Sequence, residues 1–139
     1  MTDAIETPDL DALVSAALRA ADLGASVYVL MPERVAEHVP TLLVRHVAGG
    51  AATRLGTVVG MVSLQALAPT RREASELARR AVSALIRAAR AQFAHGGAHL
   101  GTVTYATGAP IEVRTGSPAP DPGRFRFQTT LRVTARTTL

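Results

Sequence analysis

The chain contains no cysteine, no lysine and no tryptophan, and only 4% of its 139 residues are aromatic. Without cysteine there is no disulfide framework, no thiolate metal site and no cysteine nucleophile. The few aromatic rings leave little on which the bases of a single-stranded nucleic acid could stack. All 15 basic residues are arginine, which together with the abundant alanine is typical of a GC-rich genome. A high arginine count is therefore weak evidence for DNA binding.

Long apolar runs are also absent. A membrane helix needs about 20 consecutive apolar residues, and the longest weakly polar run, residues 56–68, is interrupted by Thr57, Ser63 and Gln65. The first seven residues carry two acidic residues and no basic one, unlike the start of a signal peptide. The sequence predicts a soluble protein that is made in the cytoplasm and has no membrane partner.

What is present is enough for one folded domain. Hydrophobic residues make up 47% of the chain and charged residues 19%, which favours a packed core over disorder. Since domains commonly have about 100–200 residues, we expect a single domain spanning residues 1–139. The net charge of +4 and the pI near 10.9 indicate a mildly basic surface. Direct, sequence-independent contact with phosphates is the alternative interpretation of this charge.

A first helix is predicted near the N-terminus. Thr7 is a suitable N-cap, Pro8 fits the first helical position because no amide donor is needed there, and Gly24 is expected to end the helix. Between these residues a single apolar stripe recurs at helical spacing. It consists of Leu10, Leu13, Val14, Ala17, Leu18 and Ala21.

A longer helix is predicted in the middle of the chain. Thr70 and Glu73 form a capping box, in which each side chain satisfies an end amide of the other residue. The helical period continues to about Gln92 or Phe93 and stops before the Gly96-Gly97 pair. Small alanines alternate with larger apolar residues along this helix, which favours close packing against a sheet.

The remaining apolar segments are predicted strands. Residues 57–68 alternate between an apolar face and a face that is more polar in its middle, as in a sheet covered on one side. The order of elements predicts an α+β fold, with a mostly antiparallel sheet of about four to five strands and the N-terminal and long helices packed on one face. The predicted strands are 26–30, 41–47, 57–68, 99–105, more weakly 111–114, and 125–136.

A long connection is expected before the last strand. Residues 106–123 are too rich in proline and glycine for regular structure and too long for an ordinary connection. We predict a flexible loop that becomes ordered against a neighbouring subunit or a tube, and a loop exposed to solvent is the alternative. Its prolines are Pro110, Pro118, Pro120 and Pro122.

The strand at 58–67 runs into Ala-Pro-Thr-Arg-Arg-Glu-Ala-Ser-Glu-Leu-Ala-Arg-Arg-Ala-Val-Ser-Ala-Leu, and the chain closes with Phe-Arg-Phe-Gln-Thr-Thr-Leu-Arg-Val-Thr-Ala-Arg. Over residues 27–136 this order resembles the tail terminator, or tail completion, proteins of siphophages and related prophages. Members of that family commonly have a strand ending in alanine, a helix of the form T-x-x-E-A-x-x-L-A and a C-terminal strand studded with arginine.

The resemblance implies a structural virion protein with no enzymatic activity, no active-site residues and no cofactor. It implies a homo-oligomer, a hexameric ring at the head-proximal end of the phage tail, assembled in the host cytoplasm. Such a ring stops polymerisation of the tail tube protein and joins the tail to the head–tail connector, or neck protein. DNA passes through its lumen without sequence-specific binding. Another neck or minor tail protein of similar fold and a basic nucleic-acid-binding module are the alternatives.

Two groups of arginines are candidate interface or lumen-facing residues. The long helix carries a basic stripe, but Glu76 lies inside it, so salt pairing on a solvated face is the alternative. On the last strand the arginines share one face, and protection of an edge strand by charge is the alternative. The candidates are Arg72, Arg79 and Arg87 on the helix and Arg124, Arg126, Arg132 and Arg136 on the strand.

Residues that could carry out chemistry are few. His95 and His99 are four apart, but the Gly96-Gly97 pair between them breaks any helix, so we expect no metal site. Glu112 is expected to be an isolated carboxylate. The serines within the predicted helices and strands lack the Gly-x-Ser-x-Gly turn that exposes a nucleophile. The sequence therefore predicts no catalytic constellation.

Overall fold

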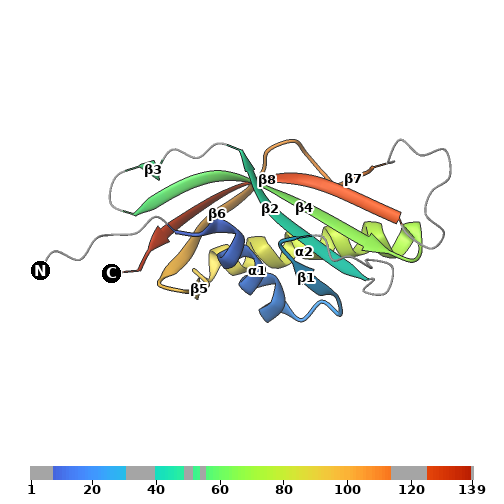
Figure 1. Cartoon of the computed structure of the whole chain (residues 1–139), viewed down its shortest axis with the longest axis horizontal. Helices are drawn as coiled ribbons and strands as arrows, with labels where there is room; N and C mark the ends of the chain where they lie inside the picture. Colours follow the sequence, from blue (N-terminus) through green and yellow to red (C-terminus); the bar gives the residue numbers. More distant parts are fainter. Residues whose placement is uncertain (1–7, 31–39, 49–51, 54–55, 114–124, 139) are drawn as a thin grey trace, which may run out of the picture.

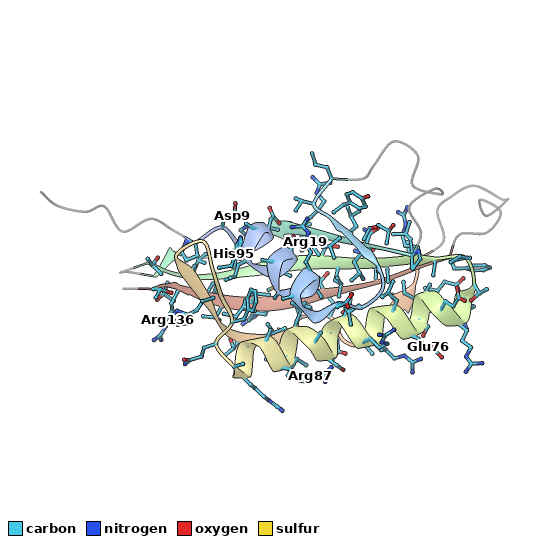
Figure 2. All side chains as sticks on the ribbon, turned by 90° about the horizontal axis from the view of Figure 1, so that it is seen from below. Asp9, Arg19, Glu76, Arg87, His95 and Arg136 are labelled. Carbon is cyan, nitrogen blue, oxygen red and sulfur yellow. The ribbon has the colours of Figure 1, made fainter. Side chains whose placement is uncertain are left out.

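The computed structural model describes residues 8–30, 40–48, 52–53, 56–113 and 125–138. Within them, a curved sheet packs against two helices that lie on the same side of it (Figure 1). The predicted α+β fold class is confirmed. Viewed from the helix side, both helices lie in front of the strands (Figure 2).

The sheet has the strand order β1-β2-β4-β8-β6-β5, with β3 paired to β4 and β7 to β8. The β1–β2 pair is parallel and the other pairs are antiparallel. This is more than the four to five strands expected, because β3 and β5 are too short to show a hydrophobic period. The short strand β7 lies within the weakly predicted strand 111–114. The strands are β1 (Ser26–Tyr28), β2 (Thr41–Ala48), β3 (Ala52–Thr53), β4 (Thr57–Ala68), β5 (Ala94–His95), β6 (Ala98–Tyr105), β7 (Ile111–Glu112) and β8 (Phe125–Thr137).

The long helix α2 (Arg71–Arg90) begins where the sequence predicts. Thr70 Oγ1 accepts a hydrogen bond from the Glu73 amide (3.2 Å), which confirms Thr70 as the N-cap. The helix ends two to three residues before the predicted position. Its apolar face lies across β4, β6 and β8 and includes the buried residues Ala74, Leu77, Ala78, Ala81, Val82 and Leu85.

The short helix α1 (Leu10–Ala21) is capped by different residues from those predicted. Asp9 is its N-cap, and Asp9 Oδ1 accepts a hydrogen bond from the Ala12 amide (3.2 Å). Thr7 lies outside the described residues. At the other end Asp22, with φ of 50°, takes the left-handed capping position that was expected of Gly24. Aspartate serves in both places because its short polar side chain is a good N-cap and tolerates left-handed backbone.

A glycine on β4 allows α1 to approach the sheet. A Cβ atom built on Gly60 would lie 2.5 Å from Leu10 Cδ1 and 2.7 Å from His46 Nε2. Leu10 is only 2% exposed and belongs to the core. The side chain of Leu10 therefore fills the space that a larger residue at position 60 would need.

The two faces of the sheet differ as the alternation predicts. On β8, Leu131, Val133 and Ala135 are fully buried and face the helices, whereas Arg132 and Arg136 are exposed on the other face. Paired residues of neighbouring strands point to the same face. The face opposite the helices, called the open face below, can therefore be followed from strand to strand.

Part of the predicted loop at 106–123 lies against β8 of the same chain. Residues 106–113 are described, and the amide of Ala106 donates to Thr130 O (2.9 Å) while the amide of Val113 donates to Arg126 O (2.9 Å). Between them, Thr129 Oγ1 donates to Gly108 O (2.7 Å). Within 106–113 the chain therefore has an intramolecular partner, and residues 114–123 lie outside the described residues.

Candidate functional site

The open face gathers arginines from two strands. Arg132 and Arg136 lie on β8 with Arg126, and the register carries the same face to β2 through the pairs Arg45–Ser63 and Ser63–Thr130. Arg45 therefore joins the three β8 arginines. The alternation within 41–47 places Arg45 on the other face of the strand from Leu42 and Val44. Which residues lie next to Arg45 on the neighbouring strands is known only from the register of the sheet. Arg124 lies outside the described residues.

The open face carries no acidic side chain among the residues described. The four long strands β2, β4, β6 and β8 contain no aspartate or glutamate at all. The only acidic residue in a described strand is Glu112 of β7, and it is paired with Phe127, which faces the helices. Besides the arginines, the open face carries apolar residues, including Met61 opposite Arg132 and Val59 opposite Thr134. It also presents hydroxyl and amide groups, from Ser63, Gln65, Thr102, Thr104, Gln128, Thr130 and Thr134.

Exposure varies along this face. Leu43 and Leu67 are buried at one end of it. Arg45, Arg132 and Arg136 are exposed toward the other end, and Arg126 is half-buried. The accessible part of the open face is thus the part where the guanidinium groups of Arg45, Arg132 and Arg136 lie.

Hydrogen bonds order the polar groups between the arginines. Thr102 Oγ1 donates to Thr134 Oγ1 (2.9 Å), and Gln128 Nε2 donates to Ser63 Oγ (3.3 Å). The Oε1 atom of Gln65 is buried, and no described group donates a hydrogen bond to it. These contacts hold the neutral side chains in place across β4, β6 and β8.

The arginines of α2 lie on the other side of the molecule. The buried face of α2 packs on the sheet, so its exposed arginines point away from the open face. Arg72 Nε lies 3.0 Å from Glu76 Oε1, in agreement with the alternative interpretation of salt pairing, and Arg79 Nε donates to Ser75 O (3.3 Å). Figure 2 shows Glu76 and Arg87 along α2 and Arg136 toward the opposite end of the molecule from Glu76. The structure therefore separates the two predicted arginine groups.

A groove of about 560 Å³ runs between the end of α1 and the exposed side of α2. Because Glu76 contributes a carboxylate beside the arginines, this groove is less uniformly basic than the open face. Its lining residues are Ala21, Leu23, Glu76, Arg79, Arg80, Ser83 and Arg87.

The expectation that Glu112 is isolated is wrong. Arg71 Nε lies 2.9 Å from Glu112 Oε2, and the Arg71 guanidinium lies 5.4 Å from the centre of the Phe127 ring. This contact joins the start of α2 to β7 and β8 over a sequence separation of 41 residues. A pairing so distant in sequence leaves no signal in local spacing.

The two histidines do not form a metal site. They lie in a hairpin whose turn, Gly96-Gly97, has positive φ at both residues (61° and 79°). His99 is paired with Arg136 on the open face, whereas His95 is paired with Ala98, which belongs to the core. The two imidazoles therefore project to opposite faces. In the described part of the chain, no group of three or more His, Cys, Asp or Glu side chains could hold a metal ion.

The two edges of the sheet differ. At one edge β1 covers the first three residues of β2, and farther along β2 the carboxylate of Asp11 accepts a hydrogen bond from the His46 amide. At the other edge β5 covers only Ala98 and His99 of β6, and no described strand pairs with the outer side of residues 101–105. Among the described residues, therefore, one edge is blocked and the other, called the open edge below, is not paired along residues 101–105.

The backbone direction on the open edge follows from one hydrogen bond. Because the amide of Ala106 points to Thr130 of β8, alternation makes Thr104 point to β8 as well. The amide and carbonyl groups of Val103 and Tyr105 therefore point outward from the sheet. Residues 91–111 contain no aspartate, glutamate, lysine or arginine, and Tyr105 is 44% exposed. This edge lacks the charges with which sheets commonly protect an exposed strand.

No family model and no curated protein matches this chain in sequence. The features of the molecule that bear on its function are the open face, the open edge and the arginine positions. No helix in the described ranges is long and apolar enough to cross a membrane.

Proposed function

We propose that the protein is a ring-forming assembly subunit, the tail terminator of a long-tailed phage or prophage. In this proposal six copies form a ring at the head-proximal end of the tail tube. The ring stops growth of the tube, binds the tube protein on one side and the head–tail connector on the other, and lets DNA pass through its lumen. The unequal edges of the sheet are the observation that supports the proposal.

In a cyclic ring each subunit uses one surface to bind the neighbour on one side and a different surface to bind the neighbour on the other side. The two surfaces must therefore be complementary and unlike each other. A sheet with two similar open edges would pair with itself or grow into an open stack. Here the β2 edge is blocked by β1 and by Asp11, whereas the β6 edge is uncharged and no described strand pairs with residues 101–105. An extended segment of a neighbouring subunit that pairs with Val103 and Tyr105 would satisfy their backbone groups.

The proposal assigns no catalytic role to any residue, and four of the described carboxylates have structural contacts. Asp9 caps α1 and Asp11 holds the His46 amide. Glu76 and Glu112 each pair with an arginine. These groups are used in holding the fold together, as in a protein whose surfaces serve assembly.

The mass distribution of the purified protein tests the proposal. We expect closed rings in negative-stain micrographs and a concentration-dependent rise in mass by light scattering. Thr104→Lys places a charge on the edge strand β6, between the outward-pointing backbone groups of Val103 and Tyr105, and should leave the protein monomeric. Ser83→Lys adds the same charge on the exposed side of α2 and should leave ring formation unchanged. Monomers at every concentration up to the millimolar range, or open filaments in place of rings, would contradict the proposal.

A further inference from the structure

We propose that the open face of the sheet binds the phosphate backbone of duplex DNA, without reading its sequence. Arg45, Arg132 and Arg136 are the phosphate contacts, and Arg126 extends the row along β8. This inference rests on the proposed function in one respect, because that function identifies the polyanion as duplex DNA. The charge of the face is an observation that does not depend on it.

These arginines differ from several other described arginines in having no described partner, and from Arg79, Arg80 and Arg87, which lie beside Glu76, in sharing their face with no described carboxylate. Arg71 and Arg72 pair with glutamates, and Arg19 Nη2 donates to Val27 O (2.9 Å). By contrast, Arg45 and Arg132 have no carboxylate partner among the described residues, and neither has Arg136. Like charges on one face repel one another, and that repulsion is relieved when an anion binds across them. An acid-free face of this kind therefore fits a strongly negative partner.

The spacing of the charges favours an extended polyanion over a small one. At about 3.3 Å per residue, Arg132 and Arg136 start about 13 Å apart along β8, and Arg126 lies about 33 Å from Arg136. Arg45 lies two strands away, about 10 Å to the side. The three exposed arginines are thus spread over about 20 Å along the sheet, more than half of one turn of duplex DNA, which is about 34 Å. A small anion would instead need groups that converge on one point.

The neutral side chains of the face fit phosphate oxygens. Hydroxyl and amide groups commonly donate to phosphates and fix a protein on the duplex without reading bases. On β6, Thr102 and Thr104 are exposed, and they lie beside Arg132 of β8. The described part of the open face projects no helix or loop that could enter a groove and reach base edges. Contacts to phosphate alone predict binding that is independent of sequence and steeply dependent on salt.

The test is fluorescence anisotropy with a labelled duplex of about two turns, roughly 21 base pairs, over a series of salt concentrations. Each phosphate contact contributes about −0.9 to the slope of log K against log salt. Three contacts give a slope of about −3 for the unmodified protein. The Arg132→Gln/Arg136→Gln double variant should reduce the slope to about −1 and weaken binding about 60-fold at 0.1 M salt, from two contacts of about eightfold each.

The matched control is Arg79→Gln/Arg87→Gln, which removes the same charge from the exposed side of α2. It should leave the salt slope unchanged. Equal weakening by both double variants would overturn the inference, because net charge alone would then explain binding. Absence of binding by the unmodified protein at low salt would also overturn it. Tighter binding of poly-glutamate than of DNA would overturn it in favour of an acidic protein partner.

Two further measurements keep the outcomes separate. Thermal unfolding followed by circular dichroism establishes that each variant is folded before its affinity is interpreted. Light scattering on the same samples reports the oligomeric state. If the protein binds DNA in a salt-dependent way but never forms rings, the terminator function is contradicted and the DNA-binding face is supported. If it forms rings that bind no DNA, the terminator function is supported and the DNA-binding face is contradicted.

Discussion

The contact between α1 and β4 gives the sharpest prediction about stability. Gly60→Ala adds a methyl group that would lie 2.5 Å from Leu10 Cδ1 and 2.7 Å from His46 Nε2. Carbon atoms normally meet at about 3.5–4.0 Å, so Leu10 must move by about 1 Å or more. His46 is exposed and can turn aside, but Leu10 is 2% exposed and lies next to the N-cap of α1.

The expected cost follows from two opposing terms. Overpacking a core typically destabilises a protein by about 1–3 kcal/mol. Replacing a strand glycine by alanine returns about 0.4–1 kcal/mol, because the unfolded chain loses conformational freedom. Gly60→Ala should therefore lower the free energy of unfolding by about 1–2 kcal/mol. With a slope of about 2 kcal/mol per molar in urea, the unfolding midpoint should fall by about 0.5–1 M.

Urea unfolding followed by circular dichroism measures this shift, and a double-mutant cycle tests its cause. Leu10→Ala alone should cost about 2–5 kcal/mol, since it leaves a cavity. In Leu10→Ala/Gly60→Ala the added methyl occupies part of that cavity, so the double variant should be at least about 1 kcal/mol more stable than the sum of the single effects predicts. Additive effects, or a Gly60→Ala protein as stable as the parent, would show that Leu10 does not restrict position 60.

Three further perturbations test contacts between elements. Thr70→Ala removes the N-cap of α2 and should destabilise the protein by about 1 kcal/mol in the same assay, whereas Thr70→Ser should restore most of that loss. Asp11→Ala leaves the His46 amide on β2 without its acceptor and should cost about 1–2 kcal/mol, with faster amide exchange at His46 by NMR; unchanged exchange would argue against the contact. A double-mutant cycle of Arg71→Ala and Glu112→Ala should give a coupling of about 0.2–1 kcal/mol, because Arg71 is largely exposed, and the coupling should shrink in high salt.

Several features of the fold follow from sequence spacing alone. The capping box and the helical period predict α2, because both depend on residues at most four positions apart. The alternation along 125–136 separates a buried face from an arginine face, since side chains of a strand point to opposite sides in turn. The apolar helix stripes and the polar side of β4 likewise predict helices on one face and an open face on the other.

Only the tertiary structure decides which of these residues become neighbours. Strand register between segments far apart in sequence brings Arg45 onto the face of Arg132 and Arg136. Packing of α2 against the sheet brings Arg71 to Glu112, 41 residues away. The same packing sends the α2 arginines to the opposite side of the molecule. The hydrophobic periodicity of a segment shows which of its own side chains lie on each face. Strand pairing depends instead on contacts between segments that are distant in sequence. The sequence by itself therefore determined the elements and their faces, and the register of the sheet decided which arginines share a surface.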